Sequence, residues 1–190
     1  MLKGHDPTLF GWMTTAAYVA AALLAWAAAR TKARDRQNDH WRAAVFWAST
    51  AAFMALLALN KQLDLQTFLT DLLRREARTG GWYGQRRAYQ LLFIQAMGLL
   101  GLVAGGAVYW WVRRERAAVK AGAVGVLLSA AFIVVRAASF HHHDVLGRVE
   151  VAGFRAHMVL EWSCIAIVAV AAAMEWRHAF YDEDGGTVRR

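Results

Sequence analysis

The sequence predicts an all-α protein, a polytopic transmembrane bundle of five helices with one further amphipathic helix at the membrane surface. Of its 190 residues, 58% are hydrophobic, more than in an ordinary soluble domain. These residues are gathered in blocks of about 20, the length that crosses a hydrocarbon core about 30 Å thick. Basic residues cluster directly after apolar blocks, as they do in cytoplasmic loops. The net charge of +8 is therefore attributed to membrane topology and not to nucleic-acid binding.

The helices are expected within a single transmembrane domain of residues 1–178, followed by a polar C-terminal tail of residues 179–190. They are expected to span about residues 9–29, 41–59, 88–112, 119–140 and 154–174. The first block is longer than a signal-peptide core of about 7–15 residues and precedes the basic run RTKARDR, which favours a retained helix. The third block ends in YWWVRRER, an aromatic belt with a basic anchor, and its Gly101 and Gly105 have a spacing that allows close helix packing.

The second loop predicts the amphipathic helix, over about residues 64–79. Its apolar side chains, Leu65, Phe68, Leu69 and Leu72, fall on one helical face, and most of its charged residues lie elsewhere. Such a helix lies flat on a membrane surface with its apolar face in the lipid. The two glycines that follow predict its end.

The basic charge of the loops predicts the orientation. The first and third loops carry the densest basic runs, so both are expected on the cytoplasmic side of a bacterial inner membrane. Alternation then places the N-terminus outside and the C-terminus in the cytoplasm. The arginines of the second loop count against this orientation and are partly offset by acidic residues.

Two polar groups that are far apart in the sequence are expected to share the outer surface. The second block is followed by Asn60, Lys61, Gln62 and Asp64, and the fourth ends in His141, His142, His143 and Asp144. A rise of about 1.5 Å per residue places Gln95, Arg136 and Glu161 roughly 10 Å deep. A charge at that depth needs a partner, so Arg136 is expected to pair with Glu161. Ser139 shares a helical face with Arg136, as His157 does with Glu161, and together these residues predict an outward-facing polar pocket.

The histidines have two interpretations. Imidazole and carboxylate groups bind zinc, iron, copper or nickel, so the run from His141 to Asp144 is a candidate site for a divalent transition metal such as zinc. His157 and Glu161 could add ligands to it. The alternative is that the histidines cap a helix at the interface and have a structural role. Neither HHHD nor HMVLE is a specific metal motif, and Cys164, the single cysteine, excludes a multi-cysteine site.

Three stretches, LALNKQLDLQT, GWYGQRRAYQ and VRAASFHHHD, together resemble a family of small bacterial inner-membrane proteins with about five helices. The resemblance covers most of the chain and implies a membrane protein, but the family has no established activity and implies no mechanism. Similar sequences are sometimes labelled isopropylmalate isomerase. That enzyme is soluble and holds an iron–sulfur cluster with three cysteines, so the label does not fit a chain with one.

Several functions remain open at this point. The first is a non-catalytic accessory or a ligand- or metal-binding membrane component, with the lipid bilayer and other membrane proteins as its partners and no nucleic acid. The second is a metal-dependent intramembrane hydrolase or transferase acting on a lipid-linked or envelope substrate, in which a bound metal activates water. A haem-binding electron carrier is a third, less favoured, interpretation. A transporter is disfavoured because the chain has no evident internal repeat.

The predicted orientation can be tested by labelling single cysteines in intact cells, in a Cys164→Ala background. A membrane-impermeant maleimide should label a cysteine at Asp144 and should not label one at Thr31, because the first loop is expected in the cytoplasm. Labelling of Thr31→Cys without labelling of Asp144→Cys would show that the orientation is the opposite of the predicted one.

Overall fold

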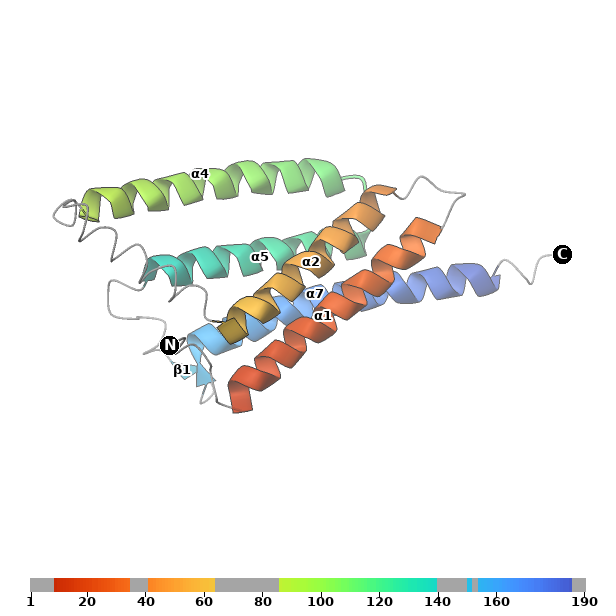
Figure 1. The fold of residues 1–190 in the computed structure, drawn as a ribbon. Helices are drawn as coiled ribbons and strands as arrows, with labels where there is room; N and C mark the ends of the chain where they lie inside the picture. The colour runs from red at the N-terminus through yellow and green to blue at the C-terminus, as the bar shows by residue number, and fades with distance from the viewer. Residues whose placement is uncertain (1–8, 35–40, 64–85, 140–149, 152–153, 186–190) are drawn as a thin grey trace.

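The computed structural model describes residues 9–34, 41–63, 86–139, 150–151 and 154–185. Five helices make up nearly all of this part of the chain (Figure 1). They are α1 (Leu9–Arg34), α2 (Trp41–Leu63), α4 (Arg86–Val112), α5 (Ala117–Ser139) and α7 (Ala156–Gly185). All five contain a stretch that is long and apolar enough to cross a membrane, which confirms the predicted number of such helices.

The helix bounds differ from the expected ones mainly at the C-terminal ends. The helices α1 and α2 continue to Arg34 and Leu63, and α7 continues to Gly185, into the segment expected to be a polar tail. Charged residues end a membrane span but do not end a helix, whereas glycine commonly does. A two-residue antiparallel pair that was not predicted precedes α7, with β1 (Glu150–Val151) on β2 (Phe154–Arg155). The predicted interfacial helix of residues 64–79 lies outside the described residues.

Small residues form the centre of the bundle. On α1, Ala21, Ala25 and Ala28 have no exposed surface, and their spacing of four and three residues puts them on one helical face. On α7, Val168 and Ala172 are equally buried. Large apolar side chains such as Leu23 instead point outward. This distribution suits a membrane, where small residues let helices approach closely and the exterior stays apolar.

Helix α1 packs against α2 and α7, and α5 packs against α7, whereas α4 lies at one edge of the bundle (Figure 1). The packing glycines are on α5 and not on α4. A Cβ at Gly122 would lie 2.6 Å from the Trp47 ring, and one at Gly125 would lie 2.7 Å from Val168. At Gly101 and Gly105 a Cβ would meet nothing within 4 Å, so the close packing expected there is not formed by the described part of the chain.

These glycines provide a matched stability test. Gly125→Leu should destabilise the bundle by about 1–3 kcal/mol, because the new side chain enters the occupied α5–α7 interface. Gly105→Leu adds the same side chain to an open helix face and should leave stability nearly unchanged. Unfolding of the purified protein, titrated with SDS in mixed micelles, measures both. Equal effects of the two substitutions would contradict the assigned packing.

Candidate polar site at one end of the bundle

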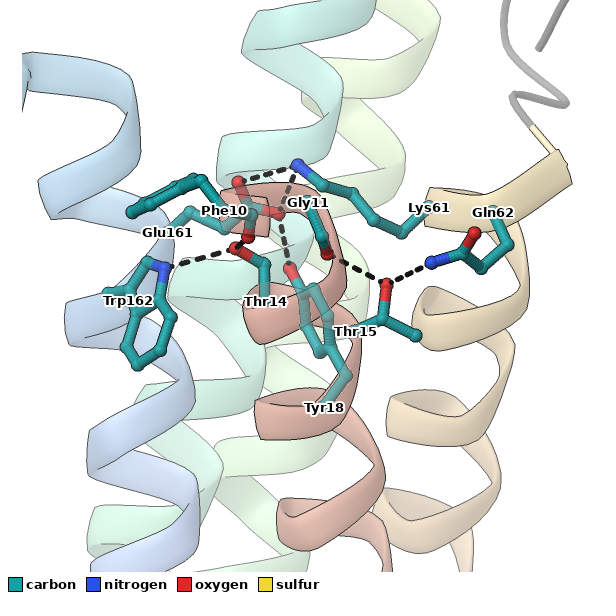
Figure 2. A network of polar contacts seen from close by, with 9 residues as sticks. All are labelled: Phe10, Gly11, Thr14, Thr15, Tyr18, Lys61, Gln62, Glu161 and Trp162. Atoms are coloured by element: carbon teal, nitrogen blue, oxygen red, sulfur yellow. Dashed lines mark hydrogen bonds and ion pairs between the residues drawn. The ribbon is translucent and has the colours of Figure 1, made fainter. Parts of the chain in front are cut away.

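Three helix segments meet at one end of the bundle and bring polar side chains together. The start of α1, the end of α2 and the start of α7 lie side by side there (Figure 2). The residues they contribute are called the polar cluster: Thr14, Thr15, Tyr18, Lys61, Gln62, Glu161 and Trp162.

Glu161 is the centre of the polar cluster. Its side chain is buried, and it forms an ion pair with Lys61, whose Nζ lies 3.2 Å from Oε2 and 3.4 Å from Oε1. The hydroxyl of Tyr18 donates a hydrogen bond to Oε1 at 3.2 Å. A buried carboxylate is tolerated only when it is paired and hydrogen-bonded, so this arrangement ties α2 and α1 to α7 at one point.

Two threonine hydroxyls link α1 to its neighbours on either side. Gln62 Nε2 donates to Thr15 Oγ1 at 2.8 Å, and Trp162 Nε1 donates to Thr14 Oγ1 at 3.1 Å. Each hydroxyl in turn donates to the carbonyl oxygen four residues earlier in α1, at 2.9 Å for Thr14 and 3.0 Å for Thr15. Both hydroxyl groups therefore donate and accept within the protein, and neither is positioned as a nucleophile.

One acceptor of the polar cluster lacks a donor among the described residues. The Oε1 atom of Gln62 is buried and accepts no hydrogen bond from them, although Nε2 of the same amide is bonded to Thr15. A buried amide oxygen without a donor costs about 1–3 kcal/mol, so this atom is suited to an N–H or O–H group of a ligand or of water. The side chain of Lys61, the preceding residue of α2, is 16% exposed, so the polar cluster reaches the surface of the bundle.

The structure brings together three of the predicted site residues, namely Lys61, Gln62 and Glu161. Asn60 and His157 are half-buried in the same end segments, α2 and α7. Gln95 is exposed on α4 and does not join the polar cluster, because α4 lies at the edge of the bundle.

The remaining predicted residues cannot be placed in the same way. Arg136 and Ser139 belong to α5, where only their backbone is described, so the Arg136–Glu161 pair stays a prediction; the cation found beside Glu161 is Lys61. The other predicted residues, Asp64, His141, His142, His143 and Asp144, lie outside the described residues. Within the described ranges, His, Cys, Asp and Glu side chains form no group of three or more that could hold a metal ion.

Sequence reasoning missed a second buried ion pair, at the opposite end of the α1–α7 interface. Lys32 Nζ lies 2.8 Å from Glu175 Oε1, with side-chain exposures of 5% and 1%. Lys32 follows Tyr18 by 14 residues, and Glu175 follows Glu161 by 14. Fourteen residues are about four helical turns and about 21 Å, so each helix presents both polar residues on one face. That equal spacing in two apolar blocks was the available signal.

Comparison with known proteins identifies no relative of this chain. No protein-family model, no curated protein and no solved structure matches this chain. Its function is therefore argued from the geometry of the polar cluster.

The Lys61–Glu161 pair predicts an unequal response to single substitutions. Lys61→Met leaves a buried carboxylate without its cation and should cost about 3–5 kcal/mol. Glu161→Leu should cost less, because the longer and partly exposed Lys61 side chain can turn toward water. The double variant should be more stable than the sum of the two effects implies.

The double-mutant cycle is measured by equilibrium unfolding, in mixed micelles, of the native protein, the two single variants and the double variant. Glu115→Gln, in the turn after α4, is a control for the loss of a carboxylate and should change stability little. Additive effects of the Lys61 and Glu161 substitutions would show that the pair does not couple the helices.

Proposed function

We propose that the protein is a multi-pass component of the bacterial inner membrane that binds a small polar ligand at the polar cluster without transforming it. Five apolar helices are compatible with a multi-pass membrane protein. The resemblance to a family of small inner-membrane proteins supports the same placement. The predicted orientation, with the N-terminus outside, would make the polar cluster accessible from the outer side.

The observation that carries the proposal is the buried Gln62 Oε1, in the same polar cluster as the Lys61–Glu161 pair. The amide oxygen offers an acceptor, and the Lys61 ammonium has a third N–H donor beyond the two directed at Glu161. A ligand with an N–H or O–H group next to an oxygen acceptor would satisfy both. Small amides, amino acids and polyols have this chemistry.

The geometry favours binding over catalysis. Glu161 is engaged by the Lys61 cation and by the Tyr18 hydroxyl, so using it as a general base would require breaking the contacts that join three helices. The Thr14 and Thr15 hydroxyls donate to helix carbonyls and are not activated by a base in this arrangement. The hydrolase or transferase interpretation depends on His141, His142, His143 and Asp144, and metal analysis of the purified protein tests it separately.

Ligand binding should appear as thermal stabilisation of the purified protein. Primary amides, amino acids and polyols would be screened one at a time, since a ligand at 100 times its dissociation constant stabilises by about 2.7 kcal/mol. The shift should be lost in Gln62→Leu, which removes the free acceptor. It should be kept in Gln95→Leu, the same substitution at an exposed position on α4.

Two results would count against this function. If no compound raises the melting temperature of the native protein more than that of the Gln62→Leu variant, the polar cluster is structural. If the protein binds stoichiometric zinc and the His142→Ala substitution abolishes that binding, a metal-dependent enzyme becomes the better supported function.

A further inference from the structure

The end of the bundle opposite the polar cluster carries arginines that lie over tryptophan rings. The guanidinium of Arg42 lies 5.7 Å from the centre of the Trp41 ring and 5.6 Å from that of Trp111. The two rings meet edge to face, with their centres 5.2 Å apart and an interplanar angle of 87°. Trp111 Nε1 also donates to the carbonyl oxygen of Arg42 at 3.3 Å. This group therefore joins the start of α2 to the end of α4.

Two further pairs repeat the arrangement. Arg113 lies 3.8 Å from the centre of the Trp110 ring, and Arg30 lies 6.0 Å from that of Trp26. The Trp26–Arg30 pair has a spacing of four residues along α1, which places both side chains on one helical face. These residues are called the Arg–Trp cluster: Trp26, Arg30, Trp41, Arg42, Trp110, Trp111 and Arg113.

The charge around the Arg–Trp cluster is strongly positive. Exposed basic side chains at this end of α1, α2, α4 and α5 are Arg30, Arg34, Arg42, Arg113, Arg114, Arg116 and Lys120. Among the described residues, the nearby acids are Glu115, which is half-buried, and Glu175, which is buried and paired with Lys32. The acidic residues Asp182–Asp184 lie at least about 10 Å further along α7. An anionic partner therefore meets an excess of cations here.

The exposed tryptophans indicate which anion fits. The rings of Trp26, Trp41 and Trp110 are 51%, 49% and 63% exposed, next to the exposed apolar exterior of the bundle. Tryptophan belts lie where the acyl chains of a bilayer meet the headgroups, which is also the level of the lipid phosphate. A guanidinium held over an indole keeps its N–H edge free, and that edge matches two oxygens of one phosphate group.

From this we infer a binding site for the phosphate of an anionic phospholipid, formed by Arg42 and Arg113 between the start of α2 and the end of α4. Basic pockets between membrane helices on the cytoplasmic side bind anionic lipid headgroups by the same chemistry. The inference rests on the membrane insertion proposed above. The bound lipid would also help to hold α4 against α2, because α4 has few other contacts with the rest of the bundle.

The test compares the full-length protein in nanodiscs of phosphatidylglycerol and of phosphatidylcholine. Phosphatidylglycerol should raise the melting temperature of the native protein, and native mass spectrometry should show retained phosphatidylglycerol adducts. Arg42→Gln and Arg113→Gln should each weaken phosphatidylglycerol binding roughly tenfold, as expected for the loss of a charge-assisted contact. Arg34→Gln removes an exposed arginine from the same end and should leave binding almost unchanged.

Three outcomes would overturn the inference. Equal weakening by all three substitutions would show diffuse attraction to the surface instead of a site. Complete competition by inorganic phosphate would show a site for a soluble anion. Full retention of binding by both Arg42→Gln and Arg113→Gln would place the lipid elsewhere.

Two controls keep these outcomes interpretable. Arg42→Lys keeps the charge but loses the forked donor, so it should fold and bind with intermediate affinity. Alkaline carbonate extraction of membranes reports insertion alone, so release of the protein there would contradict the proposed membrane placement independently of lipid specificity.

Discussion

The structure depends on how it neutralises carboxylates that are buried in an apolar bundle. Glu161 and Glu175 are both buried on α7, and each needs a cation at the same level. Lys61 of α2 and Lys32 of α1 supply these cations. A shift of α7 by one residue against both α1 and α2 would separate both pairs at once. The two ion pairs therefore set the register of α7 against its two neighbours, α1 and α2, more strictly than the buried alanines can, because one small apolar residue replaces another at little cost.

The small residues between the two pairs make this arrangement possible. Ala21, Ala25 and Ala28 let α1 approach α7 closely, and Gly125 does the same for α5. Close approach of the backbones brings short polar side chains within hydrogen-bonding distance of the next helix. Thr14 reaches Trp162 in this way, and Thr15 reaches Gln62. Packing and polar contacts thus depend on the same choice of small residues on α1.

Much of the fold could be predicted from the sequence, because a membrane span needs only a block of sufficient length and apolarity. Depth along a helix follows from counting residues, and Lys61, Gln62 and Glu161 lie together at one end of the bundle. Rotation about a helix axis does not follow in the same way, because alanine covers much of the circumference of α1 and α7. Tyr18 could equally have pointed to lipid. The same ambiguity explains why the spacing of Gly101 and Gly105 indicated close packing, whereas Gly122 and Gly125 form the packed contacts.

Helix α4 shows what happens where such polar contacts are missing. Its middle exposes Leu99, Leu102 and Val103, and the described side chains of that stretch make no polar contact with another helix such as those that fix α1 and α7. The described polar contacts of α4 are concentrated at its last turn, where Trp111 contacts Arg42 and the chain reverses into α5. Among the described residues, no polar side-chain contact fixes α4 to another helix further along its length. The position of α4 is therefore the part of the fold most sensitive to its surroundings, and the Arg–Trp cluster is the point at which the surroundings can act on it.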